Sequence, residues 1–97
     1  MFEIEKIELG GGSFLGLKAT LEGLPPLLLV KGGKGFVMCG YLNIEAAERL
    51  GAIAAVVSGV ESFDDVLNAE IKVATSKAEA IGLKPGKVVR SVIEKIA

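Results

Sequence analysis

The amino-acid sequence predicts an α/β protein of the α+β type. We expect a two-layer sandwich in which a mixed β-sheet carries short helices on one face and begins with an N-terminal β-hairpin region. Before Asn43, short apolar runs separated by glycines and prolines are typical of strands. After Asn43, apolar residues recur at helical spacing around one uninterrupted apolar run, residues 52–57. At 97 residues, the chain predicts a single domain with a β-rich oligomerisation region at 1–30 and an α/β core at 31–97.

Four strands are predicted in the N-terminal part. The first alternates apolar and charged residues as far as Lys6, which indicates a half-buried strand. Pro25 and Pro26 break the chain before the third strand, because each lacks a backbone donor and has a fixed φ. The strands are expected at residues 2–9, 14–21, 27–31 and 36–42.

Two glycine-rich loops lie between these strands, GGGS at 10–13 and GGKG at 32–35. Neither has the GxxxxGK[ST] spacing or the following helix that a phosphate-binding loop requires. GGKG separates two apolar runs, which favours an antiparallel hairpin turn.

A helix and a buried strand follow. Asn43 is a good N-cap and Gly51 a good C-terminal cap for a helix with outward Glu and Arg residues. The run 52–57 has no polar break, which is typical of a parallel strand buried on both faces. Together with the strand 36–42, these segments predict a βαβ unit.

Capping boxes predict two further helices. Ser62 with Asp65 opens a helix that runs to about Ala69, and Ser76 with Glu79 opens a helix of one or two turns. A short strand at 71–74, parallel to the two before it, is expected between them. A final helix carries one apolar stripe made of Val88, Val89, Val92, Ile93 and Ile96.

Composition excludes several classes of function. The chain has 11 Lys and Arg against 12 Asp and Glu and few aromatic residues, so neither a nucleic-acid surface nor a membrane-binding surface is expected. Without His and with one Cys, no metal site and no cofactor are predicted. The single Cys and an acidic N-terminus unlike a signal peptide predict a cytoplasmic protein. The lack of Gln and the scarcity of Asn are typical of a thermophilic source.

The chain is unusually apolar for its size. Hydrophobic residues make up 51% and the mean hydropathy is +0.53. We therefore expect that copies of the chain cover part of one another's apolar surface. The predicted partner is the chain itself, in a homo-oligomer joined through the strands of residues 2–29.

Three stretches resemble a known family: MCGYLN at 38–43, AAVVSGV at 54–60 and SFDDVL at 62–67. From residue 31 to the C-terminus, the chain is similar to the YunC-like family of uncharacterised bacterial and archaeal proteins, a domain of unknown function. The resemblance implies a two-layer α/β fold whose N-terminal β region builds a tetramer, and it brings no known activity. Ala52 and Glu61 stand where the family has an acidic and a basic residue, which we interpret as surface variation.

Cys39 allows two interpretations. It shares a strand face with Val37 and Tyr41, which favours a core side chain packed against the strand 52–57. It also lies just before the helix that begins at Asn43, where a thiolate is stabilised, which favours a nucleophile. In the absence of His, the partner base would be Lys31, Lys34 or Glu45.

The carboxyl ends of three parallel strands would lie along one edge, where three helices begin. Helix N-termini present unpaired N–H groups that suit an anion, and open α/β sheets bind ligands at this edge. The alternative is that these residues only cap helices. The candidate ligand-binding residues are Gly40, Tyr41, Asn43, Ser58, Gly59, Thr75 and Ser76, and Cys39 is the candidate catalytic residue.

Three functions follow as hypotheses. The first is a small homo-oligomer that binds a small anionic ligand at the carboxyl edge of its sheet. The second is a thiol-dependent enzyme that uses Cys39 on a small acyl or carbonyl substrate. The third is a structural or partner-binding module without a ligand. The residues specify neither a substrate nor a partner.

Overall fold

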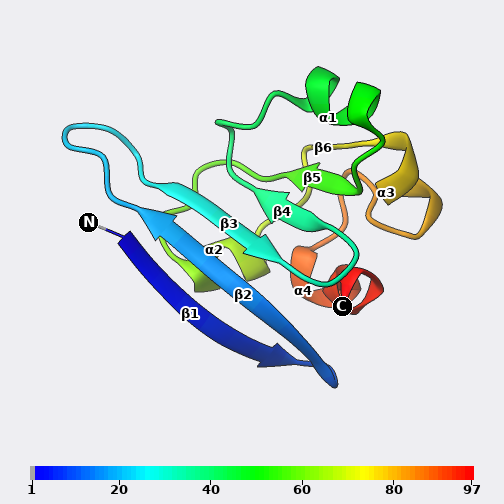
Figure 1. The fold of residues 1–97 in the computed structure, drawn as a ribbon, viewed down its shortest axis with the longest axis horizontal. Coiled ribbons are helices and arrows are strands. Elements are labelled where there is room, and N and C mark those ends of the chain that lie inside the picture. Colours follow the sequence, from blue (N-terminus) through cyan, green and yellow to red (C-terminus); the bar gives the residue numbers. More distant parts are fainter. Residues whose placement is uncertain (1) are drawn as a thin grey trace.

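A computed structural model describes residues 2–97 as one open six-stranded sheet with short helices packed against it (Figure 1). The predicted fold class, a mixed sheet with short helices, is confirmed. The elements in chain order are β1 Phe2–Leu9, β2 Gly12–Ala19, β3 Leu27–Lys31, β4 Phe36–Met38, α1 Ile44–Leu50, β5 Ala54–Val56, α2 Phe63–Asn68, β6 Val73–Ala74, α3 Ser76–Ala80, α4 Val89–Val92 and the 3-10 helix η1 Ile93–Ile96.

The strands lie in the sheet in the order in which they follow one another in the chain. From β1 to β4 every neighbour is antiparallel, and β4 and β5 are parallel, as the βαβ prediction requires. The last pair corrects the sequence analysis: β6 runs antiparallel to β5, with Ala74 opposite Ala55. The carboxyl end of β6 therefore lies at the opposite edge of the sheet from those of β4 and β5.

The strands are shorter than the sequence indicated in the C-terminal part. β4 was predicted to run to residue 42 and ends at Met38. Cys39 makes one further bond to β3, from its N–H to the Leu28 carbonyl at 3.1 Å, and the chain then turns, with the Leu42 N–H donating to the Cys39 carbonyl. The predicted strands at 52–57 and 71–74 shrink to Ala54–Val56 and Val73–Ala74. The predicted strand at 14–21 begins earlier and ends earlier, at Gly12–Ala19.

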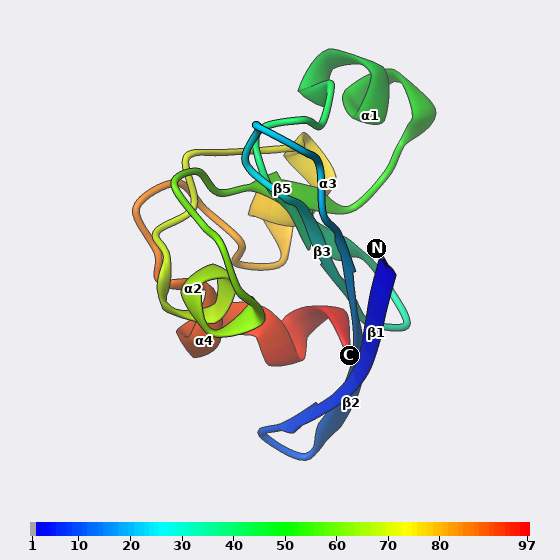
Figure 2. The ribbon, with the colours of Figure 1, turned by 90° about the vertical axis from the view of Figure 1, so that its left-hand side faces the viewer.

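One face of the sheet carries the main hydrophobic core. Val30, Val37 and Ala55 lie opposite one another across neighbouring strands and therefore point to the same face. They are fully buried beneath α2, α3, α4 and η1, which Figure 2 shows, in part, on one side of the sheet. From the helices and the connecting segments, the core receives Val66, Leu67, Ile71, Ala78, Leu83, Val89, Val92, Ile93 and Ile96.

Helix α1 packs on the other face (Figure 2), so the prediction that the helices all lie on one face of the sheet is wrong for α1. Val56 follows the core-facing Ala55 in β5 and therefore points away from the main core, and Val73 points the same way because it is paired with Val56 across β5 and β6. Val73 lines a shallow groove with Ile44, Glu45, Glu48 and Arg49 of α1. The chain therefore leaves β4 toward one face of the sheet and leaves β5 toward the other.

The remainder of this second face, over β1–β3, is covered by no described helix (Figure 2). We call it the open face. Phe2 and Ile4 are 71% and 67% exposed, and β1, predicted to be half-buried, is largely exposed on both faces. The cross-strand register places the side chains of Phe2, Ile4, Leu15, Leu17 and Leu29 together on the open face. The register also places Lys6 and Lys31 on it, on either side of Leu15.

The GGKG segment forms the predicted hairpin turn between β3 and β4, closed by a 2.9 Å bond from the Gly32 N–H to the Gly35 carbonyl. Its glycines also allow close packing. A Cβ at Gly32 would collide with the Ile96 carbonyl oxygen, and a Cβ at Gly35 with the Ile53 carbonyl oxygen. The turn thus anchors the C-terminal helix as well as reversing the chain.

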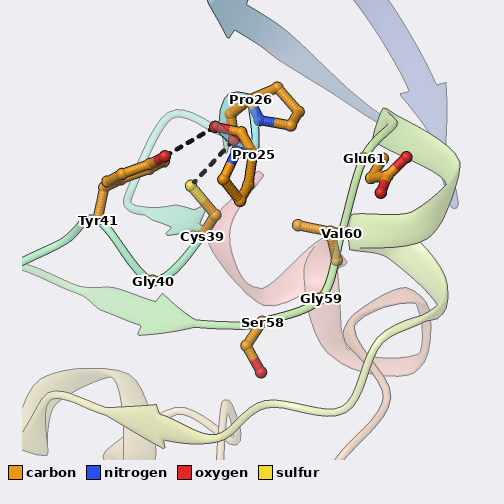
Figure 3. A pocket seen from close by; sticks show the side chains of 9 residues that line it. All are labelled: Pro25, Pro26, Cys39, Gly40, Tyr41, Ser58, Gly59, Val60 and Glu61. Atoms are coloured by element: carbon orange, nitrogen blue, oxygen red, sulfur yellow. Dashed lines mark hydrogen bonds between the residues drawn. The ribbon is translucent and has the colours of Figure 1, made fainter. Parts of the chain in front are cut away.

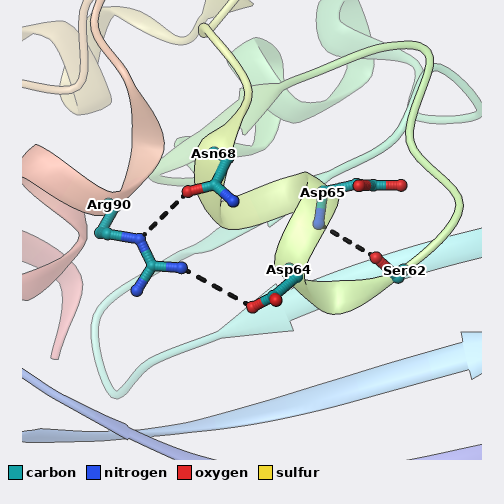
Figure 4. A network of polar contacts seen from close by, with 5 residues as sticks. All are labelled: Ser62, Asp64, Asp65, Asn68 and Arg90. Carbon is teal, nitrogen blue, oxygen red and sulfur yellow. Dashed lines mark hydrogen bonds and ion pairs between the residues drawn. The ribbon is translucent and has the colours of Figure 1, made fainter.

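The predicted caps are confirmed for two helices. Asn43 accepts the N–H of Ala46, and Gly51 ends α1 in the left-handed conformation. Figure 4 shows the Ser62 hydroxyl accepting the Asp65 N–H at the start of α2. It also shows Arg90 bridging from α4 to Asn68 and Asp64 of α2, at 3.2 Å and 3.7 Å. Because this contact is exposed, it orients the two helices more than it stabilises them.

The predicted capping box of Ser76 with Glu79 is wrong. The N-cap of α3 is Thr75, whose hydroxyl accepts the Ala78 N–H, while Ser76 contacts Glu48 of α1 instead. The final apolar stripe is divided between α4 and η1; Val89, Val92, Ile93 and Ile96 are buried, and Val88 is exposed.

No helix among residues 2–97 is long and apolar enough to cross a membrane.

Candidate functional site

A cavity of about 470 Å³ opens beyond the ends of β4 and β5 (Figure 3). It lies among three loops, which precede β3, follow β4 and follow β5. The loop residues are mostly small or apolar, so the walls of the cavity are mostly apolar. The lining residues are Pro25, Pro26, Cys39, Gly40, Tyr41, Ser58, Gly59, Val60 and Glu61.

The position of the cavity follows from the topology. β4 and β5 are the one parallel pair among the described strands, so their carboxyl ends lie side by side. After β4 the chain turns toward α1 on one face, and after β5 it turns toward α2 on the other. Such a switch point leaves a crevice between the two departing segments, and open α/β sheets bind ligands there.

The third wall comes from the β3–β4 hairpin. Since these strands are antiparallel, the residues before β3 lie beside the residues after β4. The Tyr41 hydroxyl donates a 2.7 Å hydrogen bond to the Pro25 carbonyl and ties the two loops together (Figure 3). Because two consecutive prolines fix φ, this wall is stiff.

Cys39 is 5% exposed, so the predicted burial at the end of its strand is confirmed. Its sulfur accepts the Leu28 N–H at 3.3 Å, and its S–H donates to the Pro26 carbonyl at 3.8 Å. Both polar partners belong to the segment around the start of β3. The thiol was predicted to pack against the strand 52–57, and Cys39 belongs to the same core cluster as Ala55 and Val57 of that strand. The thiol is a buried, partnered group in the cavity wall.

Five of the predicted site residues line this cavity: Cys39, Gly40, Tyr41, Ser58 and Gly59. Asn43 does not line it and caps α1. The prediction that Thr75 and Ser76 join the same edge is wrong, because β6 is antiparallel to β5. Thr75 instead lies beside the amino end of β5, where its hydroxyl donates to the Ala52 carbonyl at 2.7 Å.

Ser76 links α3 to α1 through Glu48. Its N–H donates to the Glu48 carboxylate at 2.8 Å and its hydroxyl to the second carboxylate oxygen. The Ser76 hydroxyl, and after it the Ser76 N–H, hold the pKa of the Glu48 carboxyl below its usual range. A lowered pKa means that the folded state favours the ionised carboxyl.

We expect the Glu48→Gln variant to be less stable than the natural protein at pH 7. The stabilisation by the carboxylate is present above about pH 4.5 and is lost as the pH falls through the lowered pKa of Glu48. The difference between the two proteins should therefore shrink in acid. Urea unfolding from pH 7 to pH 3 measures it. Ser76→Ala should remove the larger part of the same pH dependence, because it removes the hydroxyl and keeps the N–H that also donates to the carboxylate. A difference that stays constant with pH would contradict this assignment.

Comparison with known proteins shows which family the chain belongs to. Residues 38–96 match the family described as "Domain of unknown function (DUF1805)", which is more than half of the chain. The chain belongs to this family. It is 30% identical over 73 residues to the uncharacterised protein YunC of Bacillus subtilis, with 71% of this chain and 72% of that protein covered. The resemblance to YunC-like proteins is thereby confirmed.

A solved structure agrees across the whole fold. A protein of unknown function from Thermoplasma acidophilum, TA1206, superposes with a TM-score of 0.95 at 44% identity. The match covers all of this chain and 94% of that one. The DUF1805 match starts at Met38, so it includes the cavity loops after β4 and β5 but not the prolines before β3.

Within this DUF1805 chain, the predicted partner bases of Cys39 lie elsewhere. Lys31 pairs with Phe36, roughly 10 Å along β4 from Cys39 at 3.3 Å per residue. Lys34 lies in the hairpin turn beyond it, where its N–H donates to the Ile96 carbonyl. Glu45 lies beside the groove under α1. None of the three lines the cavity.

Sequence reasoning missed Pro25, Pro26, Val60 and Glu61. The prolines were treated only as a chain break, although the predicted hairpin already placed them beside the end of β4. Val60 and Glu61 follow directly on Ser58 and Gly59, and no pattern marked them as part of a wall. Figure 3 shows the Val60 side chain directed toward Cys39 and the Glu61 carboxylate turned away from it.

Among residues 2–97, no three His, Cys, Asp or Glu side chains gather where they could hold a metal ion.

Proposed function

We propose that the protein binds a small, largely apolar molecule in the cavity between the ends of β4 and β5. The observation that carries this proposal is the coincidence of the cavity with the switch point of the sheet. Its size lies within the range of small-molecule sites, and its walls include two prolines, Val60 and the ring of Tyr41.

The charge of the lining residues disfavours the anion that the sequence analysis expected. The nine described lining residues include one carboxylate, Glu61, and no Lys or Arg. The helices that follow β4 and β5, α1 and α2, are each under two full turns, and side chains already cap them. We therefore propose a ligand without a net negative charge.

Binding ranks ahead of thiol catalysis. A nucleophilic Cys requires a base within hydrogen-bond reach, and none of the three predicted bases lines the cavity. The thiol of Cys39 is also occupied by the Pro26 carbonyl. The proposed role of Cys39 is to form part of the cavity wall.

A screen of small neutral ring compounds tests the proposal. Cys39 is the chain's single Cys and is buried in the wall, so a maleimide reaches it only when the wall opens, and a ligand in the cavity should slow this reaction. The same ligand should raise the melting temperature of the protein. Binding without protection of Cys39 would place the site elsewhere.

A pair of glycine variants controls the experiment. A Cβ at Gly40 meets no atom within 4 Å, so Gly40→Leu should fold and fill space at the cavity. Gly33→Leu adds the same side chain in the hairpin turn, at the other end of β4. Ligands should stabilise Gly33→Leu and leave Gly40→Leu unaffected. Equal stabilisation of both variants, or no ligand in the screen, would overturn the proposal.

We also propose that copies of the chain assemble through the open face. Sheets with an apolar face bury it against another layer, and no described helix lies over this face of β1–β3. Phe2 and Ile4 are the most exposed of its residues. A tetramer agrees with the family resemblance.

Light scattering tests this assembly. We expect the natural chain to show a mass near four times its 10.1 kDa, and Ile4→Glu to lower that mass. Leu50→Glu is the matched control, because Leu50 is 84% exposed on α1 and lies outside the open face. A monomeric natural chain would contradict the proposal, as would an equal effect of the two substitutions.

We also propose a cytoplasmic location, which suits a protein whose single Cys is buried and forms no disulfide. A thermophilic source stays a prediction. The structural or partner-binding module is the outcome if the screen finds no ligand.

A further inference from the structure

We infer that residues 20–26, which connect β2 and β3, form a strap at the cavity that opens to admit a small molecule and that the Tyr41 hydroxyl keeps closed. The role of the strap in ligand entry rests on the proposed function. Its opening depends only on hydrogen bonds and burial in the protein itself, so it can be measured without a ligand.

The strap is weakly attached to the rest of the molecule. None of its residues belongs to the hydrophobic core of residues 2–97. Within the same residues, its one backbone hydrogen bond outside the β2–β3 ladder is internal, from the Leu24 N–H to the Leu21 carbonyl at 3.2 Å. Pro25 and Pro26 have no N–H to donate. A segment with so few buried contacts opens at a lower free energy than the whole chain unfolds.

Two side chains from the segment after β4 connect the strap to the body of the protein (Figure 3). The Tyr41 hydroxyl donates to the Pro25 carbonyl at 2.7 Å, and the Cys39 thiol donates to the Pro26 carbonyl at 3.8 Å. Because a thiol is a weak donor, the Tyr41 bond is the stronger of the two. Tyr41 is 46% exposed, so water can replace the Pro25 carbonyl when this bond breaks.

The other end of the strap is fixed at β3. Leu28, the second residue of that strand, is fully buried, and its N–H donates to the Cys39 sulfur at 3.3 Å. The two prolines fix φ, so the part of the strap between β3 and the Tyr41 bond is stiff. Loss of the Tyr41 bond therefore releases this part as one body and uncovers the thiol behind it.

Alkylation by N-ethylmaleimide, itself a small neutral ring compound, reports this opening because the single Cys is buried in the closed form. Tyr41→Phe removes the hydroxyl and keeps the ring. We expect this variant to react about fivefold faster than the natural protein, the effect of one lost hydrogen bond on the opening equilibrium.

Ser91→Ala is the matched control. The Ser91 hydroxyl also donates an exposed 2.7 Å bond to a backbone carbonyl, that of Val88, and Ser91 lies on α4, outside the cavity lining. This variant should react at the natural rate. Urea unfolding of all three proteins corrects each rate for any change in the stability of the whole chain.

The outcomes separate the strap from the binding function. If Tyr41→Phe reacts at the natural rate, or faster only in proportion to its unfolding constant, the strap is overturned and the binding function stands. An equal acceleration by Ser91→Ala would also overturn it. If Tyr41→Phe alone reacts faster but the ligand screen finds no compound, the opening stands, and its role in ligand entry falls with the binding function.

Discussion

Replacing Gly32 with alanine is expected to destabilise the fold by about 3 kcal/mol. The added Cβ would collide with the carbonyl oxygen of Ile96 and press on the Phe14 ring. The same carbonyl accepts the Lys34 N–H at 2.9 Å, so it cannot move aside without breaking the contact that anchors the C-terminal helix. Urea unfolding of the purified variant measures the change.

Gly33→Ala is the control for this prediction. A Cβ at Gly33 would lie 3.5 Å from the Ala97 carbonyl, an ordinary van der Waals contact, so this variant should unfold close to the natural protein. Equal stability of the two variants would show that the hairpin turn does not pack against Ile96 as described.

Replacing Thr75 with valine is expected to cost about 3 kcal/mol, although the two side chains have nearly the same shape. Thr75 is 1% exposed and its hydroxyl joins three backbone groups. It donates to the Ala52 carbonyl at 2.7 Å and accepts the N–H groups of Ala54 and Ala78 at 3.2 Å and 3.3 Å. Valine would take this partner from all three groups, and it would leave the N–H groups of Ala54 and Ala78 buried without a partner.

Thr75→Ser keeps the hydroxyl and removes one buried methyl group, so it should cost only about 1 kcal/mol. Thermal and urea unfolding of the two variants separate the hydrogen-bond loss from the packing loss. If valine proved as stable as serine at this position, the hydroxyl would not be the link between β5 and α3.

The fold class was predictable because the local patterns agree with one another. The run of Leu27–Lys31, the turn GGKG and the cap at Asn43 each specify their element without help from distant residues. The direction of β6 was not predictable. Residues 57–72 are long enough for either a parallel crossover or an antiparallel return, and a two-residue strand carries too short a pattern to decide between them.

The N-cap of α3 was predicted wrongly for a similar reason, because a distant contact decides it. Both Thr75 and Ser76 are good N-cap residues, and Ser76 with Glu79 has the spacing of a capping box. Thr75 is the cap because its hydroxyl also serves Ala52 and Ala54 at the start of β5, a contact between residues more than twenty positions apart. No local pattern contains that information.

About half of the cavity was predictable from the sequence. Cys39 to Tyr41 and Ser58 with Gly59 follow two strands that the apolar runs identified as parallel, and parallel strands end at one edge. The expected chemistry did not follow, because the choice of an anion rested on helix N-termini that the structure finds short and capped by side chains. The lining residues, and not the helix N-termini, determine which ligand charge the cavity favours.

The amide shifts of the natural protein on addition of a small neutral ring compound, such as cyclohexanecarboxamide, test the ligand site most directly. If the cavity binds the compound, the ¹H–¹⁵N signals of Gly40, Tyr41, Ser58 and Gly59 will move together and saturate with one dissociation constant. The signals of Gly33 and Lys34, in the hairpin turn at the other end of β4, will stay in place. Shifts confined to the open face, or no shifts at millimolar compound, would contradict the account.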